Sequence, residues 1–269
     1  MFTPSRNFHR HWLPYTCENV YRTAPLFKDF ITMLTPFLIS VVFLLAGFIQ
    51  GMTGFGSALV AIPLLSLFID IKSAVPLCIL NSLVITTYLS LKMRKDLDAK
   101  KIVPLCVAAV PGIVIGTTLL KQVDSIIIRR SLGILLVCYS LYSLIVTPRP
   151  RKLHKAWSYV AGFSSGAIGA AFSAGGPPTI IYTAMNDWKK DTIKATLSGF
   201  FLFNSYLIAV VHAIDGLTTV EIFTYFMISA PVVLLGTVLG SISYGKIPHA
   251  LYLKIIFAFL ILMGIMMIV

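Results

Sequence analysis

Charged residues are scarce in this chain. They make up only 12% of the 269 residues, while 57% are hydrophobic, whereas about a quarter of the residues in a soluble globular domain are charged. Among the charged residues, acidic side chains are the rarer kind, with 10 Asp and Glu against 22 Lys and Arg. This composition leaves no room for a soluble domain and predicts an all-α, polytopic (multi-pass) protein of the cell membrane, that is, an inner or plasma membrane.

Several kinds of chemistry lack the residues that they require. No Asp, Glu, Lys or Arg lies deep inside an apolar segment, and charged residues such as Lys194 and Asp215 fall at or near segment ends. Proton pumps usually carry an ionisable relay within the membrane, and ATP-driven proteins carry a glycine-rich phosphate loop. The sequence contains neither, nor a carboxylate pair, a Ser/Cys–His arrangement or a metal-ligand spacing. We therefore expect no enzyme activity, no catalytic residue, no metal and no cofactor.

Apolar residues form ten segments, five in each half of the chain. Crossing a hydrocarbon core takes about 20 residues, and residues 55–70 and 176–186 are short for this purpose. Short apolar pieces suit half-helices or re-entrant hairpins, so we expect each half to hold about four full transmembrane helices plus one broken half-helix. The segments are 33–51, 55–70, 74–91, 102–120, 127–147, 156–172, 176–186, 194–214, 221–242 and 250–269.

The two halves share a repeated stretch. AGFIQGMTGFGSALVAIP at 46–63 corresponds to AGFSSGAIGAAFSAGGPP at 161–178, with identical residues at six positions when the offset is 115. Likewise, PGIVIGT at 111–117 corresponds to PVVLLGT at 231–237. The sequence therefore predicts four parts: an extramembrane arm (1–32), a first transmembrane repeat (33–147), a basic linker (148–155) and a second transmembrane repeat (156–269). Within each repeated stretch, glycines spaced i, i+4, i+7 line one helix face, where another backbone could pack closely.

Basic residues predict the orientation in the membrane. The loops at 92–101, 149–155 and 187–194 hold five, four and three Lys or Arg, whereas the turn at 212–221 holds none. Cytoplasmic loops are enriched in Lys and Arg. If each half crosses five times, all three basic loops share the cytoplasmic side and the halves are inverted. If each broken region crosses once, the halves are parallel and the 187–194 loop lies outside. We favour the inverted form.

Chain-breaking residues within the repeated stretch predict an anion site. Helices beginning near residues 57 and 177 would direct free backbone N–H groups and positive dipole ends toward the membrane midplane. Nearby hydroxyl and amide groups could add donors, although an intramembrane amide more often joins two helices. The candidate substrate-binding residues are Gln50, Gly51, Thr53, Gly54, Phe55, Gly56, Ser57, Asn81, Ser164, Ser165, Gly169, Ser173, Gly175, Gly176, Pro177, Pro178 and Asn204.

The same motifs resemble those of a known family. GFIQGMTGFGSALVAIPLL and GFSSGAIGAAFSAGGPPTIIY are similar to sequences of the TauE/SafE family of membrane transporters, described as sulfite and organosulfonate exporters or permeases. The resemblance covers about residues 36–269 and is strongest in G-x-x-G-F-G (51–56) and G-G-P-P (175–178). It implies a duplicated helical bundle and small sulfur-containing oxyanions as substrates. Ala170 and Ala171 stand where the first copy has Phe55 and Gly56, so the two half-sites are not equivalent.

These features predict a secondary transporter that moves a small anion such as sulfite, sulfoacetate or another organosulfonate. Export is favoured because a negative cell interior favours anion exit by about 2.3 kcal/mol per charge at 100 mV. An anion channel, a cation-coupled uptake permease for a sulfonate or carboxylate, and a non-transporting membrane subunit stay open as alternatives. The expected partners are the small anion and the lipid bilayer. A homo-oligomer is left open, and the net charge of +12 is assigned to cytoplasmic loops rather than to nucleic-acid binding. One half would rock against the other about the glycine faces.

Overall fold

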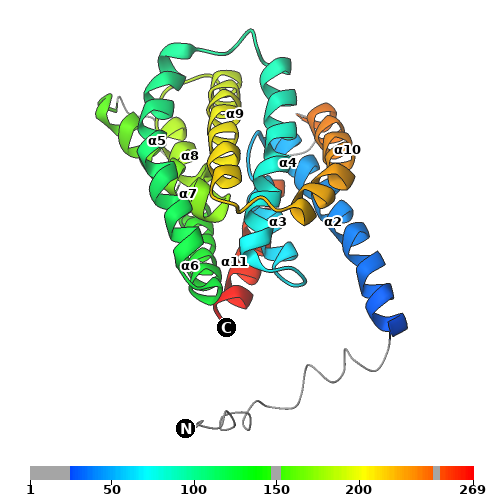
Figure 1. Ribbon diagram of the computed structural model, residues 1–269. Helices are drawn as coiled ribbons and strands as arrows, with labels where there is room; N and C mark the ends of the chain where they lie inside the picture. The colour runs from blue at the N-terminus through cyan, green and yellow to red at the C-terminus, as the bar shows by residue number, and fades with distance from the viewer. Residues whose placement is uncertain (1–24, 147–152, 245–248) are drawn as a thin grey trace, which may run out of the picture.

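The computed structural model describes residues 25–146, 153–244 and 249–269, and the regular structure in these ranges is α-helical (Figure 1). The prediction of an all-α polytopic protein is confirmed. Most of the predicted arm (1–32) and most of the predicted linker (148–155) lie outside the described residues. The helices are α2 (Pro25–Thr53), α3 (Ser57–Leu65), α4 (Ile71–Lys92), α5 (Ala99–Gln122), α6 (Ser125–Ile145), α7 (Ala156–Phe172), α8 (Gly176–Ala184), α9 (Lys190–Ile214), α10 (Val220–Ser243) and α11 (His249–Ile268).

Six helices in the described ranges are long and apolar enough to cross a membrane. The first half of the chain supplies α2 (through its apolar part, Leu34–Thr53), α4, α5 and α6, and the second half supplies α9 and α10. Helix α7 has 17 residues, and the described apolar part of α11, Ile256–Ile268, is also shorter than a full span. The structure is therefore that of a multi-pass membrane protein.

Helices α3 and α8 are half the length of a span. Each has nine residues, and at a rise of 1.5 Å per residue such a helix covers about 14 Å of a hydrocarbon core roughly 30 Å thick. The glycines and prolines of the repeated stretch explain their starts. Gly54 and Gly56 adopt positive φ angles of 88° and 96°, which glycine reaches without steric cost, and this turn separates α2 from α3.

Four of the long helices carry a side-chain cap, whereas the two short helices, like α7 and α9, do not. Asp70, Asp98 and Asp124 cap α4, α5 and α6 by accepting a hydrogen bond from a first-turn amide, and Thr219 does the same for α10. Such caps satisfy one of the backbone donors that every helix leaves free at its start. Helices α3 and α8 begin at glycines with no side-chain cap, so their first amides stay available to another acceptor.

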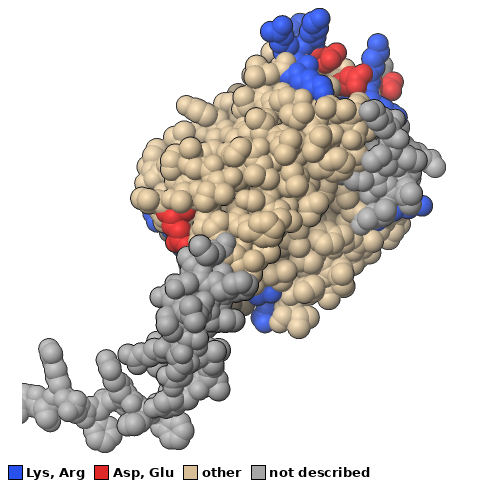
Figure 2. All heavy atoms as spheres, turned by 90° about the vertical axis from the view of Figure 1, so that its right-hand side faces the viewer, with Lys and Arg blue, Asp and Glu red and all other residues tan. Residues whose placement is uncertain are grey.

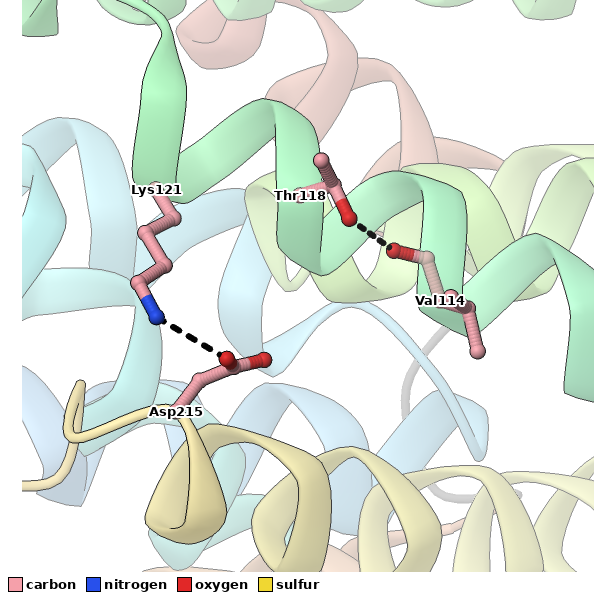
Figure 3. Close-up of polar contacts among 4 residues, drawn as sticks. All are labelled: Val114, Thr118, Lys121 and Asp215. Carbon is pink, nitrogen blue, oxygen red and sulfur yellow. Dashed lines mark hydrogen bonds and ion pairs between the residues drawn. The ribbon is translucent and has the colours of Figure 1, made fainter.

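Two side-chain contacts of α5 mark the two ends of the molecule. At one end, the Lys121 ammonium of α5 lies 3.0 Å from the Asp215 carboxylate that follows α9 (Figure 3). At the other end, the Lys101 ammonium lies 4.9 Å from the ring centroid of Trp188. This second end carries residues 92–101 and 187–194 and is called the basic end below.

Helices α4 and α9, which occupy the same place in the two predicted repeats, run in opposite directions. Lys72 at the start of α4 donates to the Lys121 carbonyl, whereas Lys92 at its end donates to Ser241 near the end of α10. Helix α4 therefore runs toward the basic end, and α9, which begins there at Lys190, runs away from it. Inverted halves would have these directions, and the inverted repeat stays a prediction with which they agree.

Two glycine seams join helices from different halves. Helix α2 packs along α10, and α5 packs along α7. In both seams the backbones approach so closely that a Cβ added to a seam glycine would collide with a carbonyl oxygen of the facing helix, as small-residue interfaces in membranes allow. The seam glycines are Gly47, Gly51, Gly236 and Gly240 between α2 and α10, and Gly112, Gly116, Gly162 and Gly166 between α5 and α7.

The helices form two interleaved bundles, and each bundle contains one of the seams. Helices α2, α3, α4 and α10 form the first bundle, and α5, α7, α8 and α9 form the second, while α6 packs against α11. A cluster of buried apolar side chains that draws mainly on α5, α7 and α9, including Leu105, Ala161 and Phe200, fills the second bundle. The bundles meet where α4 contacts α9. Each bundle contains helices from both halves of the sequence. The boundary between the bundles is therefore not the boundary between the two sequence halves.

Candidate functional site

A small cavity lies where the two bundles meet, between the starts of α3 and α8 and the middles of α4 and α9. Its volume is about 40 Å³, and because one water molecule needs roughly 10–15 Å³, it has room for about three oxygen-sized atoms. None of its lining side chains is charged. They are Gln50, Gly56, Ser57, Ala58, Leu59, Ile79, Ser82, Gly169, Ser173, Ala174, Gly175, Gly176, Phe201, Asn204 and Ser205.

The start of α3 presents backbone donors to this cavity. Ser57, Ala58 and Leu59 are the first three residues of the helix, and all three line the cavity. The amide of Val60 is the first to bond within the helix, to the Gly56 carbonyl at 3.3 Å. Since Gly56 provides no side-chain cap, three successive N–H groups and the positive end of the helix dipole are directed to one place. This arrangement is typical of anion sites.

The start of α8 is poorer in donors. Gly176 begins the helix and lines the cavity, but the next two residues, Pro177 and Pro178, carry no N–H group. The Ser165 hydroxyl fixes the turn before α8, because it donates to the Gly175 carbonyl and lies 3.2 Å from the Thr179 hydroxyl. The two half-helices therefore contribute unequally, and α3 offers three amides where α8 offers one.

Polar side chains complete the wall of the cavity. The Ser57 hydroxyl donates to the Gln50 side-chain oxygen, so this amide oxygen is engaged and the NH₂ group of Gln50 is left as a donor. The Asn204 side chain is only 4% exposed, and its Oδ1, like the Ser173 hydroxyl, is buried with no protein partner among the described residues. Unpartnered polar atoms in a buried site are costly unless a ligand or water satisfies them.

Eight of the predicted site residues line the cavity: Gln50, Gly56, Ser57, Gly169, Ser173, Gly175, Gly176 and Asn204. Others support it from outside. Ser165 holds the turn before α8, and Pro177 and Pro178 form the first turn of α8. Ser164 is half-buried on α7 and does not line the cavity.

The remaining predicted residues have other contacts. Gly51 lies in the seam with α10, and Gly54 packs against the side chain of Lys194. Thr53 and Phe55 line a separate, smaller cavity of about 10 Å³. Asn81 donates to the Leu77 carbonyl and accepts from the Ser229 hydroxyl, which makes it a link between α4 and α10 rather than part of the cavity wall.

The structure also places residues at the site that the sequence did not single out as candidates. Ser82 and Ser205 line the cavity, and each directly follows a predicted asparagine; in the first pair only the serine lines the cavity, whereas in the second pair both members do. The prediction for Lys194 is corrected by the structure. It lies near the start of a segment, as the sequence indicates, yet its side chain is buried, with 7% exposed, because it turns inward toward α2. In the described ranges, no cluster of His, Cys, Asp and Glu could hold a metal ion.

One comparison with known proteins gives a match. A family model described as Sulfite exporter TauE/SafE matches residues 39–267, which is nearly the whole described chain. No curated protein and no solved structure matches the chain. The matched range includes the cavity, both half-helices and both glycine seams.

Proposed function

The chain belongs to the sulfite exporter TauE/SafE family of membrane transporters, and we propose that it carries a small oxyanion across the cell membrane through the cavity between α3 and α8. The substrate class is sulfite, sulfoacetate or another organosulfonate. In this proposal the protein transports its substrate unchanged and performs no chemistry on it.

The observation that carries the proposal is the start of α3. Three consecutive uncapped amides, those of Ser57, Ala58 and Leu59, meet at a cavity whose lining holds no charged side chain. Neutral donors hold an anion without a full counter-charge, so the anion binds and leaves more easily than it would from an arginine clamp. The three oxygens of a sulfite ion or of a sulfonate head group match the room available.

We further propose that the two bundles, rather than the two sequence halves, move against each other. The seams between α2 and α10 and between α5 and α7 bring backbones into direct contact, and interdigitated packing of this kind resists opening. The cavity lies between the bundles instead of inside either one. A change in their relative tilt would expose the anion to one side of the membrane and then to the other.

Export is the direction that we propose. The described transmembrane interior offers no carboxylate at the cavity that could hold a coupling proton or Na⁺, and a negative cell interior already favours exit of an anion. Uptake would need a coupling ion, for which backbone carbonyls would be the available ligands.

The test uses the purified protein in liposomes with radiolabelled sulfite and a potassium diffusion potential, at an alkaline pH that limits passive permeation. Flux should follow the potential, saturate, and show counterflow, which a channel would not show. Ala58→Pro removes the backbone N–H of the second residue of α3. A proline fits this position of a helix, since the second residue of α8 is Pro177. Because a hydrogen bond to a charged group is worth about 1.5–3 kcal/mol, this variant should raise the apparent KM for sulfite by about 10-fold to 100-fold. Ala58→Ser keeps the amide and is the control; equal KM values for the two variants would reject the α3 site.

A further inference from the structure

Lys194 is a buried cation near the start of α9. Its ammonium donates to the Gly51 carbonyl at 3.1 Å and the Met52 carbonyl at 3.4 Å, and it lies 3.8 Å from the ring centroid of Tyr244. Within the described part of the chain, no carboxylate lies within ion-pair distance of it. Carbonyl groups and an aromatic ring offset only part of the cost of burying a charge, so this ammonium can still gain from a negative partner.

A second lysine reaches the same region from the surface. The ammonium of Lys92, the last residue of α4, donates to the Ser241 hydroxyl at 2.6 Å. Ser241 lies in the last turn of α10 and Tyr244 directly follows the helix, so Lys92 and Lys194 approach the same end of α10. Lys92 is exposed and Lys194 is buried. The two cations therefore form a series that leads from the surface into the protein.

The turn between α2 and α3 connects this region to the cavity. Gly54 packs against the aliphatic part of Lys194 so closely that a Cβ added to it would lie 2.9 Å from the Lys194 Cγ, whereas Gly56 lines the cavity. Gly51, whose carbonyl accepts from Lys194, directly follows the cavity residue Gln50. One short turn that rests on two glycines with positive φ thus contacts Lys194 at one end and the cavity at the other.

The charge of the surroundings suits an incoming anion. Figure 2 shows Lys and Arg side chains gathered at the end of the molecule where the α4–α5 loop lies in Figure 1, the basic end, with some Asp and Glu side chains among them. An accumulation of one sign of charge raises the local concentration of small ions of the opposite sign. Both Lys92 and Lys194 lie at this end, Lys92 exposed at the surface and Lys194 buried against the turn between α2 and α3.

We propose that Lys194, assisted by Lys92, forms an entry site for small oxyanions at the basic end, separate from the amide site of α3. An arriving anion takes the Lys194 ammonium as its counter-ion in place of the α2 carbonyls and then passes to the cavity. This inference rests on the proposed function for its substrate class. The competing explanation is that Lys194 only caps the negative end of the α2 dipole.

Transport measured from each face separates the two explanations. Full-length protein is assayed with radiolabelled sulfite in everted and right-side-out membrane vesicles. Lys194→Met should raise the apparent KM by roughly tenfold, the scale of one screened charge contact, when sulfite enters from the basic end, and leave the KM at the opposite face unchanged. Lys194→Arg should restore the wild-type value, and Lys190→Met, which removes an exposed lysine of the same helix, should have no effect. An unchanged KM, or an equal loss at both faces, would overturn the entry site.

A binding measurement keeps the inference independent of flux. The lysines of the purified full-length protein are methylated with a carbon-13 label, and the Lys194 resonance is identified by its absence in Lys194→Arg. Addition of sodium sulfite should shift this resonance saturably and leave that of Lys190 in place. A shift without any flux would support the entry site while the proposed transport fails. No shift at saturating sulfite would overturn the entry site. This measurement does not need Lys194→Met, so it still applies if that variant does not fold.

Discussion

The hydroxyl oxygens of Ser82 and Ser205 lie 3.0 Å apart where α4 crosses α9. Both residues line the central cavity, and they lie on α4 and α9, the two helices through which the first and second bundles contact each other. This hydrogen bond is therefore a direct link between the bundles at the wall of the site. Any movement that opens the cavity by separating the bundles must lengthen it.

A disulfide at this position should stop transport. In a variant that lacks the native cysteines, Ser82→Cys and Ser205→Cys together place two thiols where the hydroxyls now touch, and oxidation should join them, because thiols bridge readily when their backbones are already close. Sulfite flux should fall on oxidation and return on reduction, while each single variant responds to neither treatment. Full flux in the fully oxidised double variant would show that α4 and α9 stay together during transport.

The two asparagines of the central helices should behave differently when substituted. Asn204→Ala removes a cavity side chain whose Oδ1 has no protein partner in the described structure, so it should raise the KM for sulfite and leave thermal stability nearly unchanged. Asn81→Ala removes the bond to Ser229 and should lower stability by about 1–2 kcal/mol, since it leaves a buried hydroxyl with fewer partners. Flux titrations and thermal unfolding in detergent measure the two effects. Similar profiles for the two variants would contradict the assigned roles.

The contrast between these asparagines shows what the sequence could predict and what it could not. The starts of α3 and α8 follow from local signals, because Gly56 and the Gly175–Pro178 stretch break the chain within short apolar segments. Whether one or both members of an Asn-Ser pair face the cavity depends on the rotation of a whole helix. One residue turns a helix by about 100°, and the packing of α4 between α9 and α10 fixes that rotation.

The burial of Lys194 was beyond local prediction for a similar reason. Its position near a segment end is typical of a solvated or snorkelling lysine. Its carbonyl partners lie 143 and 142 residues away in sequence, and only the tertiary fold brings the end of α2 within reach of this side chain. The glycine spacing predicted the close contacts of four seam glycines, Gly47, Gly51, Gly162 and Gly166, but not the facing glycines of α5 and α10. The third glycine of each predicted face, Gly54 or Gly169, meets a side chain instead of a facing backbone.

Substitutions in the glycine seams should affect stability before they affect transport. A Cβ on Gly166 would collide with the Ala109 carbonyl oxygen, a backbone atom that cannot move aside without shifting α5. Overpacking of this kind costs about 1–3 kcal/mol, so Gly166→Ala should lower the unfolding temperature in detergent. Gly176→Ala is the matched control, because its added Cβ would meet the flexible end of the Ile180 side chain at 3.1 Å. Equal unfolding temperatures for the two variants would mean that the α5–α7 seam is looser than described.

The basic end should face the cytoplasm. Residues 92–101 and 187–194 share this end, and Lys and Arg accumulate in cytoplasmic loops. Single cysteines are introduced in a cysteine-free variant at Lys95, which is exposed at the basic end, and at Ser125, which begins α6 at the other end. A maleimide that cannot cross membranes should label the Ser125→Cys variant in intact cells and the Lys95→Cys variant only after the membrane is opened.

Halves arranged in parallel would instead place residue 188 outside, so a third cysteine at Trp188 decides between the two forms. Labelling of Trp188→Cys in intact cells would reject the inverted arrangement, and its protection there together with Lys95→Cys would establish that both loops lie on the cytoplasmic side.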